Sequence, residues 1–521
     1  MFKTLALKMI KTDPNQTEFV NFYLPVGGKL QASNRWIKLA AKMPWQEVER
    51  CYAESFAGTG MGAPAKSGRI AYGALIIKEQ LGISDEETVE QISENPYLQY
   101  FLGLHEFRQT ALFDPSMMVY FRSRFNQEHH RRINDKIIQP AIDVPQPQDA
   151  DDEEPPENSG KLLVDATCTP ADIRYPTDLS LLNEGREKTE HIIDCFHRHL
   201  VEETGHARRK PRTYPLKARK DYLEVAKQKS PTKKKLRRAI GKQLRYLNRN
   251  LGPIKAMVEN HHGLLRLLSN YEYTCLLVIH TLYDQQLRMY SERTHTIEDR
   301  ILSISQPHVR PIVRGKSGRK VEFGAKVSVS HQKNGYVRLD RLSWDAYNES
   351  GDLIDQIEGY RTRFGYYPAS VHADRIYRTR KNRSYCKAKG IRLSGKPLGR
   401  PRKATAENQA ELRACRLQWH EDELVRIPIE GKFGNSKRRG TLARIMAKLA
   451  HTSESVIHVG LVVLNLQTWL RKTLICLCSK APQALNILLE RLSCYFDVLK
   501  WQTYDQGKPV KARLTLFALG D

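Results

Sequence analysis

The stretch KLLVDAT, residues 161–167, is a short run of apolar and branched side chains that ends at a carboxylate, Asp165. Such a run predicts a buried strand. A second stretch of this kind, PASVHAD at residues 368–374, ends in Asp374. In α/β sheets ligands bind beyond the carboxyl ends of the strands, so two neighbouring strands would bring these carboxylates to one edge. Two close carboxylates repel each other, and one of them then needs a proton or a cation.

The segments around these two stretches predict a mixed α/β sheet. Residues 321–330, VEFGAKVSVS, alternate between apolar and polar as a strand does. Residues 336–344 and 391–395 are further strand candidates, and DIRYPTD at 172–178 is the candidate for the strand directly after the first one. Residues 353–364 predict a helix. Strands followed by strand–helix units are typical of a mixed α/β sheet.

A third carboxylate lies in the stretch VRIPIEGKFGNSKRRG, residues 425–440, where Glu430 is the one acid among many cations. A solvated face mixes charges of both signs more evenly. The pattern therefore predicts a metal-binding carboxylate at a place where a polyanion lies. On an ideal helix Arg426, Glu430 and Lys437 share one face. Pro428 is best accommodated in a first helical turn, so we expect Arg426 to lie just before the helix.

Three carboxylates at one site favour Mg²⁺ or Mn²⁺, because such cations prefer oxygen ligands. Two ions about 3.5–4 Å apart would activate an attacking oxygen and stabilise a leaving one. The alternative is that an aspartate at a strand end is an ordinary turn residue or helix cap. Four other aspartates are equally available for such a site: Asp172, Asp178, Asp340 and Asp345.

The charge of the chain points to nucleic acid as its partner. The 521 residues carry a formal net charge of +26 and the pI is about 9.6. Residues 205–250 contain 17 Lys or Arg against two acids, with tyrosines interleaved. Cations at this density neutralise DNA phosphates without reading sequence, whereas the alternative is a merely solvated basic arm. The densest run consists of Lys233, Lys234, Lys235, Arg237 and Arg238.

No membrane or secretory role is expected. The most apolar stretch, residues 456–470, falls short of the roughly 18 residues that a spanning helix needs. No signal peptide and no basic amphipathic anchor are recognisable. The nine cysteines are spread without a paired framework, which indicates reduced thiols in a cytoplasm.

Residues 1–142 predict a helical N-terminal domain. Helices are expected after Ser84, a capping residue, and after Asp114, with Gly82 ending the helix before them. Several arginines surround the last helices, so the domain is either a DNA-reading helix-turn-helix or a plain helical bundle. Residues 143–160 are acidic and rich in proline, as in a linker. No role is assigned to residues 481–521.

With these residues in view, the chain resembles bacterial insertion-sequence transposases of the DDE type, which have an RNase H-like catalytic core. The resemblance covers roughly residues 30–475 and is carried by SENPYLQYFLGL, VDAT, HADRIY and RIPIEGKFGNSKRR. Many such transposases have a Tyr-Arg-Glu-Lys signature. Arg426, Glu430 and Lys437 keep its last two spacings, but Glu423 stands at the tyrosine position.

The resemblance implies a role for each part of this pattern. Asp165, Asp374 and Glu430 would be the catalytic, metal-binding triad, and Arg426 and Lys437 would hold phosphates near the cut. The remaining cations of the stretch would hold the flanking DNA backbone: Lys432, Arg438 and Arg439. The enzyme would bind the ends of its own element and target DNA, as a homodimer or larger assembly, in the cytoplasm beside the bacterial nucleoid.

The spacing of the acids departs from that of many relatives. Asp165 and Asp374 are 209 residues apart, whereas Asp374 and Glu430 are only 56 apart. The excess predicts a basic helical insertion at about residues 181–305, emerging after the second strand of a catalytic domain at 161–480. Two alternatives stay open: a DNA-binding regulator of the same fold that does not cut, and a structure-selective nuclease without strand transfer.

Overall fold

The computed structural model describes most of the chain between residues 28 and 474. The described ranges are 28–56, 64–139, 157–205, 209–313, 321–332, 335–396 and 408–474, with the single residues 22, 24, 399 and 405. Two compact units are distinguished, residues 1–465 and 466–521. Within the second unit residues 466–474 are described, and they are helical. None of the described helices combines the length and apolar character that crossing a membrane requires.

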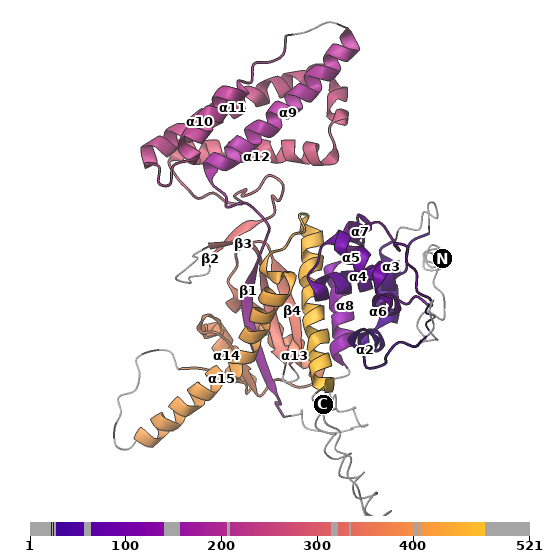
Figure 1. Cartoon of the computed structure of the whole chain (residues 1–521). Helices are drawn as coiled ribbons and strands as arrows, with labels where there is room; N and C mark the ends of the chain where they lie inside the picture. Colours follow the sequence, from indigo (N-terminus) through magenta and orange to yellow (C-terminus); the bar gives the residue numbers. More distant parts are fainter. Residues whose placement is uncertain are drawn as a thin grey trace, which may run out of the picture. The chain divides into compact units, whose positions relative to one another are not determined.

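The centre of the first unit is a six-stranded mixed sheet (Figure 1). Its order is β2-β3-β1-β5-β6, and β4 also pairs with β3. The strands are β1 (Lys161–Pro170), β2 (Arg310–Val313), β3 (Val321–Gln332), β4 (Val337–Ser343), β5 (Ser370–His372) and β6 (Arg392–Leu393). β1 runs antiparallel to β3 and parallel to β5, so the sheet changes from antiparallel to parallel at β1.

Helices cover both faces of this sheet. On one face Leu163 and Val329 pack with Ile429 and Phe433 of α15 (Gln409–Arg439), and with Leu461 of a helix that begins at residue 450. The opposite face is covered by α13 (Leu353–Phe364) and α14 (Arg380–Ala388). Alternate residues of β1 thus enter different cores, because successive side chains of a strand point to opposite faces. Burial on both sides explains why β1 reads as a continuous apolar run.

The segment between β1 and β2 is helical. It consists of α9 (Asp178–Thr204), α10 (Pro215–Ala226), α11 (Lys233–Asn260), a short 3₁₀ turn and α12 (Asn270–Glu292). These helices share a core of their own, in which Phe196, Leu247 and Ile279 are fully buried. Caps mark the boundaries: Thr177 and Ser269 accept hydrogen bonds from the first turns of α9 and α12.

The N-terminal helices are α2 (Arg35–Lys42), α3 (Trp45–Glu54), α4 (Gly68–Leu81), α5 (Asp85–Glu94), α6 (Pro96–Phe101), α7 (Met117–Arg124) and α8 (Gln127–Ile138). The expected ends of α4 and α5 are confirmed. Gly82 has a φ of 68° at the end of α4, and the hydroxyl of Ser84 accepts from the Glu87 amide at 3.0 Å. α8 contacts the sheet through Arg338 of β4, which donates to Asp135 at 3.0 Å.

The arginines of α7 and α8 are held within the helical bundle. Arg122 forms a forked ion pair with Asp85, at 3.0 and 2.7 Å. Arg132 donates to Glu47 at 2.8 Å and to Glu54 at 2.7 Å. Side chains that are engaged in this way are not available to DNA phosphates. Arg122 and Arg132 are therefore withdrawn from such contacts, and the choice between a DNA-reading module and a plain helical bundle stays a prediction.

Three expectations about local structure are wrong. DIRYPTD at 172–178 forms no strand; after Ala171 the chain is irregular until α9 begins at Asp178, so the helical insertion follows the first strand and not the second. Asp165 lies inside β1 and not at its end, because β1 continues to Pro170 along β3. Pro428 is in the interior of α15, and Arg426 therefore lies within the helix.

Some expectations fall on other parts of the chain. Most of the linker at 143–160 and all of the segment 481–521 lie outside the described residues.

Candidate active site

Asp165 and Asp374 are brought together by the register of two parallel strands. The ladder between β1 and β5 pairs Leu162 with Val371 and Leu163 with His372. Each aspartate lies two residues beyond this last pair. The two carboxylates therefore occupy matching positions where β5 ends, as the sequence predicts.

Successive side chains of β1 point to opposite faces of the sheet, and this alternation turns Asp165 toward α15. Leu163 packs against Ile429 and Phe433 of that helix. Asp165 shares this face of β1 with Leu163, since it is two residues further along the strand. Glu430 follows Ile429 on α15. The three acids of the sequence prediction are thus brought together by β1, β5 and α15.

Arg426 lies between the acids. Its guanidinium contacts Asp374 at 2.6 Å and Glu430 at 3.6 Å. The Arg426 side chain is 18% exposed, whereas those of Asp374 and Glu430 are 52% and 61% exposed. A poorly exposed cation beside two exposed carboxylates neutralises charge at the rim of a site that stays open to a large ligand.

The pKa of Asp165 lies well above its ordinary value. Burial is the main cause that raises it to about 6, and the charges of Asp374 and Glu430 raise it further. The Ala166 amide, which donates to the Asp165 carboxylate at 2.8 Å, and the charge of Arg426 act in the opposite direction. A nearby cation would stabilise the ionised form of a carboxylate in this environment.

The donor set matches a hard divalent cation, but the described side chains do not form a finished metal cage. Three carboxylates supply the oxygen ligands that Mg²⁺ and Mn²⁺ prefer. Among the described residues, however, no group of three or more His, Cys, Asp or Glu side chains lies close enough to hold a metal ion. The Asp374 carboxylate instead forms an ion pair with the guanidinium of Arg426. The three acids therefore fit divalent cations by the chemistry of their oxygens, whereas their arrangement in this structure does not form a site that could hold one.

The cations of residues 425–440 that are predicted to bind DNA phosphates after Glu430 lie on the last turns of α15. Lys437 follows Glu430 by seven residues, about two helical turns, so the two share a face. Lys432 and Lys437 are half-buried and Arg438 is exposed, 3.4 Å from the Asn435 side-chain oxygen. Arg439 is the last residue of α15, and its side chain lies outside the described atoms.

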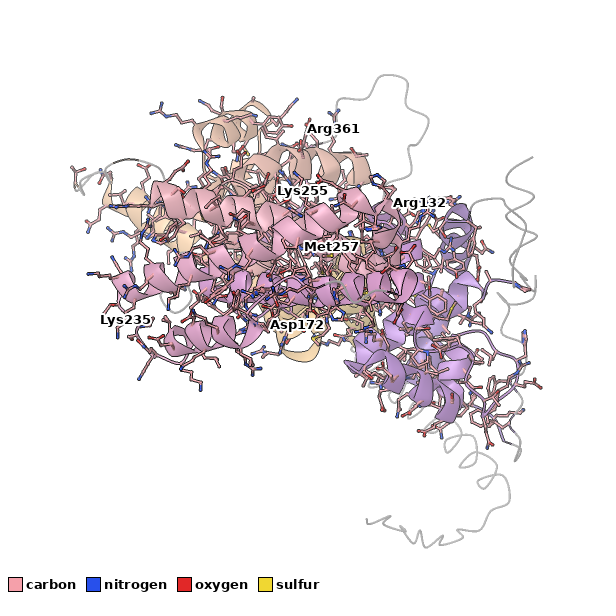
Figure 2. The ribbon with its side chains drawn as sticks, turned by 90° about the horizontal axis from the view of Figure 1, so that it is seen from above. Arg132, Asp172, Lys235, Lys255, Met257 and Arg361 are labelled. Carbon is pink, nitrogen blue, oxygen red and sulfur yellow. The ribbon has the colours of Figure 1, made fainter. Side chains whose placement is uncertain are left out.

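The predicted cations of the insertion lie at the start of α11. Lys233, Lys234, Lys235 and Arg238 are exposed, and Arg237 lies over the ring of Tyr290 at 4.2 Å. Figure 2 shows Lys235 and Lys255 toward opposite ends of α11. Three lysines in the first turn are unfavourable with the helix dipole, which is positive there. Their position therefore does not serve the stability of α11.

The four other aspartates are engaged elsewhere. Asp172 accepts from Arg444 at 2.7 Å, and Asp178 accepts from Gln286 at 2.9 Å. Asp340 accepts from Gln356 at 2.9 Å, and Asp345 lies 3.8 Å from Arg310. These contacts give each of them a structural partner away from the three acids.

Sequence reasoning missed Asp422, a nearly buried acid on α15. It accepts a forked pair of hydrogen bonds from Arg392 of β6, at 2.9 and 2.8 Å, and lies 3.5 Å from the buried His372 of β5. Asp422, Arg426 and Glu430 follow one another at intervals of four residues, so they share one face of α15. This four-residue spacing was visible in the sequence, but the partner strand was not.

Two family models match the chain. One is described as a transposase DDE domain and matches residues 371–467, and the other is a transposase domain (DUF772) that matches residues 26–124. The first match contains Asp374 and Glu430 but not Asp165. Over 145 residues the chain is 31% identical to "Uncharacterized protein ORF8 in nfe locus" of Rhizobium meliloti. The match covers 28% of this chain and 66% of that relative. No solved structure matches.

Proposed function

We propose that this chain, which the two family models support as an insertion-sequence DDE transposase, binds the terminal inverted repeats of its own element and catalyses strand cleavage and strand transfer. The observation that carries the proposal is the register of β1 and β5, which puts Asp165 beside Asp374 under the helix that holds Glu430. The mixed sheet with helices on both faces supports an RNase H-like core for residues 161–480, interrupted by the helical insertion.

In this proposal Asp165, Asp374 and Glu430 hold two divalent cations, Mg²⁺ or Mn²⁺. When bound, such ions supply Lewis-acid activation of the attacking oxygen and stabilisation of the leaving oxygen. The chain contributes the electrostatic frame. Asp165 must lose its proton to act as a ligand, and its raised pKa keeps it partly protonated near pH 6 when no cation is near.

In this proposal Arg426 contacts the carboxylates when no cation is bound and a DNA phosphate when one is. Without a cation it neutralises Asp374 and Glu430. Once the carboxylate charge is compensated, the guanidinium is available to a phosphate oxygen, which it can contact with two parallel N–H groups. Lys437, Lys432, Arg438 and Arg439 then hold the backbone on either side, and Lys233 to Arg238 of α11 hold it further away.

The net charge of +26 supports double-stranded DNA as the partner, both as transposon end and as target. Two ends must be held together for transposition, so we propose a homodimer or larger assembly in the DNA complex. The site of action is the bacterial cytoplasm, at the nucleoid.

The test uses the purified full chain and duplexes made from the DNA that flanks its reading frame, including any inverted repeats. With Mg²⁺ or Mn²⁺ the expected products are nicked ends with a free 3′-hydroxyl and, with added target duplex, joined molecules. Cleavage of junctions or hybrids without joining would instead support the nuclease alternative. Binding to ends without cleavage under any of these conditions would support the regulator and overturn the proposal.

A further inference from the structure

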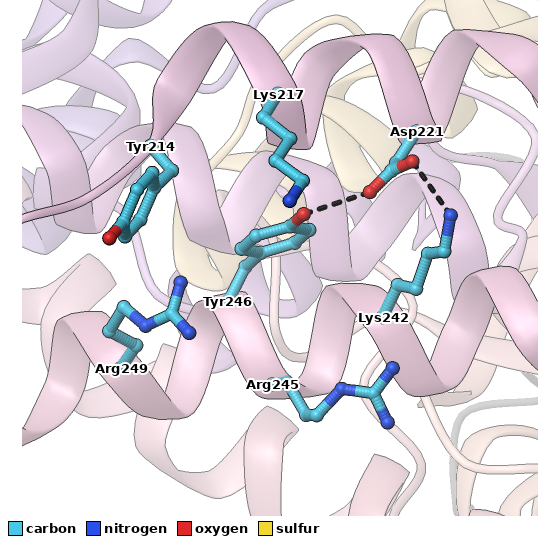
Figure 3. Close-up of a pocket in the computed structure, with 7 residues that line it drawn as sticks. All are labelled: Tyr214, Lys217, Asp221, Lys242, Arg245, Tyr246 and Arg249. Atoms are coloured by element: carbon cyan, nitrogen blue, oxygen red, sulfur yellow. Dashed lines mark hydrogen bonds and ion pairs between the residues drawn. The ribbon is translucent and has the colours of Figure 1, made fainter.

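A basic hollow lies between α10 and α11 of the insertion, away from the residues assigned above. It measures about 460 Å³ and is lined by Tyr214, Lys217, Asp221, Lys242, Arg245, Tyr246 and Arg249. Figure 3 shows the first three on or just before α10 and the other four on α11, with the Tyr246 ring between the two helices.

The carboxylate of this hollow is already satisfied. Asp221 accepts from Lys242 at 2.7 Å and from the Tyr246 hydroxyl at 2.8 Å (Figure 3). Burial opposes its ionisation, but these two hydrogen bonds together with the charges of Lys242 and Lys217 outweigh burial and lower the pKa of Asp221. The charges of Asp221 and Lys242 therefore cancel, and both α11 side chains are fixed in place.

Three further cations are left without such compensation. Lys217, Arg245 and Arg249 are exposed. No carboxylate among the described residues forms an ion pair with Arg245 or Arg249. An interhelical lock between α10 and α11 needs only Asp221, Lys242 and Tyr246. The additional cations around the hollow lower the stability of the protein when no anion is bound, because like charges repel each other.

Arg249 is held by aromatic rings. Its guanidinium lies 4.9 Å from the centre of the Tyr214 ring and 5.8 Å from that of Tyr246. Tyr214 has a φ of 52° and precedes Pro215, a backbone conformation that is strained for a tyrosine. This backbone conformation places the half-exposed Tyr214 ring against Arg249. Stacking orients a guanidinium and leaves its N–H edge available to an acceptor.

We infer that this hollow binds a backbone phosphate of double-stranded DNA, with Arg245 and Arg249 as the principal contacts and Lys217 as a supporting charge. The inference rests on the proposed function and adds a DNA contact on the insertion that the sequence pattern alone does not identify. A guanidinium held against aromatic rings, as that of Arg249 is, suits a phosphodiester, which offers two oxygens that share one negative charge and carries no base identity. The contact therefore positions DNA without selecting its sequence.

The experiment measures the affinity of the full chain for a duplex without cleavage, by fluorescence anisotropy with EDTA at several salt concentrations. The variant is Arg245→Gln/Arg249→Gln. Two lost phosphate contacts are expected to weaken binding roughly 10- to 30-fold at 0.15 M salt and to reduce the salt slope by about 2. The loss is expected to be equal for end and unrelated duplexes. Arg245→Lys/Arg249→Lys, which keeps the charge without the fork, is expected to recover part of the affinity.

The matched control is Lys255→Gln/Arg266→Gln, which removes two exposed cations of the same insertion outside the hollow. Circular dichroism checks that each variant is folded. Equal losses in variant and control, or an unchanged salt slope in the variant, would overturn the inference. So would calorimetric binding of inorganic pyrophosphate that the variant loses while its duplex affinity is unchanged, because the hollow would then serve a small phosphate compound.

The two proposals can fail separately. If the folded Arg245→Gln/Arg249→Gln variant cleaves end duplexes and its DNA affinity is unchanged, the inference that the hollow binds DNA is overturned and the transposase proposal is not affected. If the unaltered chain never cleaves DNA but the variant binds duplexes more weakly, the transposase proposal is overturned and the inference about the hollow is supported.

Discussion

Asp165 and Asp374 occupy matching positions on adjacent parallel strands, each two residues beyond the last pair of the ladder between β1 and β5. The two residues are 209 positions apart in the sequence, and the helical insertion accounts for most of that separation. Their proximity is therefore a property of the sheet. The proposals made for this site follow from that relationship and can be tested residue by residue.

The first prediction concerns the three acids. Asp165→Asn, Asp374→Asn and Glu430→Gln should each reduce cleavage of end duplexes by at least about 10³-fold, since each removes several kcal/mol of charge stabilisation from the transition state. Cleavage is measured by gel with Mg²⁺ and with Mn²⁺. Asp345→Asn is the control, because this acid is 75% exposed and lies beside Arg310. An Asp374→Asn chain as active as the control would remove that residue from the site.

The second prediction is that Asp165 destabilises the metal-free protein. Its folded pKa is raised to about 6, above the ordinary value of 3.8. The folded state therefore loses stability as pH rises between these values, and the full cost, up to about 3 kcal/mol, is present above pH 6. Asp165→Asn should raise the melting temperature in EDTA at pH 7.5 and not at pH 3.5. Equal melting temperatures of the two proteins at pH 7.5 would contradict the raised pKa.

The third prediction concerns Arg426. Arg426→Gln removes the cation that compensates Asp374 and Glu430, so the melting temperature in EDTA should fall. Mg²⁺ should then stabilise the variant more than it stabilises the unaltered protein, because it replaces the missing charge. Arg375→Gln, which removes an exposed cation directly after Asp374, should show neither effect. A smaller Mg²⁺ shift in the Arg426 variant would argue against this role.

The fourth prediction concerns Asp422 as a positioning residue. Asp422→Asn weakens the forked contact with Arg392 and should cost about 1–3 kcal/mol of stability. Because it also loosens α15 against β5 and β6, the cleavage rate should fall more than DNA affinity does. The double variant with Arg392→Gln tests the coupling: its stability loss should be smaller than the sum of the single losses. Strict additivity would show that the pair does not act as a unit.

The fifth prediction concerns two stacked imidazoles, His130 and His458, whose ring centres are 5.1 Å apart. Burial lowers the pKa of His458 to about 3 and that of His130 well below its ordinary value. A depressed folded pKa gives stability that is complete above pH 6.5 and is lost as pH falls below it. The His458 imidazole should thus remove about 2 kcal/mol between pH 6.5 and 5, and the His130 imidazole acts in the same direction.

His458→Phe should reduce the acid sensitivity seen in denaturant titrations by the contribution of this one imidazole, about 2 kcal/mol. His262→Gln changes an exposed histidine of the insertion and should leave the sensitivity unchanged. Acid sensitivity that persists in full in the His458 variant would place its origin elsewhere.

Local features that depend on neighbouring residues could be predicted from the amino-acid sequence alone. Gly82 ends one helix and Ser84 begins the next, because a left-handed turn and side-chain capping are local requirements. The apolar run of β1 predicted a buried strand, and the signature around Glu430 indicated the third acid of the predicted site. Pro428 misled the prediction of the helix start, because the long helix tolerates the loss of one N–H donor when its apolar side packs on the sheet.

Which of these segments contact each other depends on the tertiary structure. No spacing indicates that β1 pairs with β5 across a helical insertion, because strand pairing depends on contacts between residues far apart in the chain. The same holds for Asp422 with Arg392, and for the hollow where Tyr214, just before α10, lies over Arg249 of α11. The sequence supplies the acids and the cations, and the packing of the sheet and helices determines which charges compensate each other and which are left for DNA.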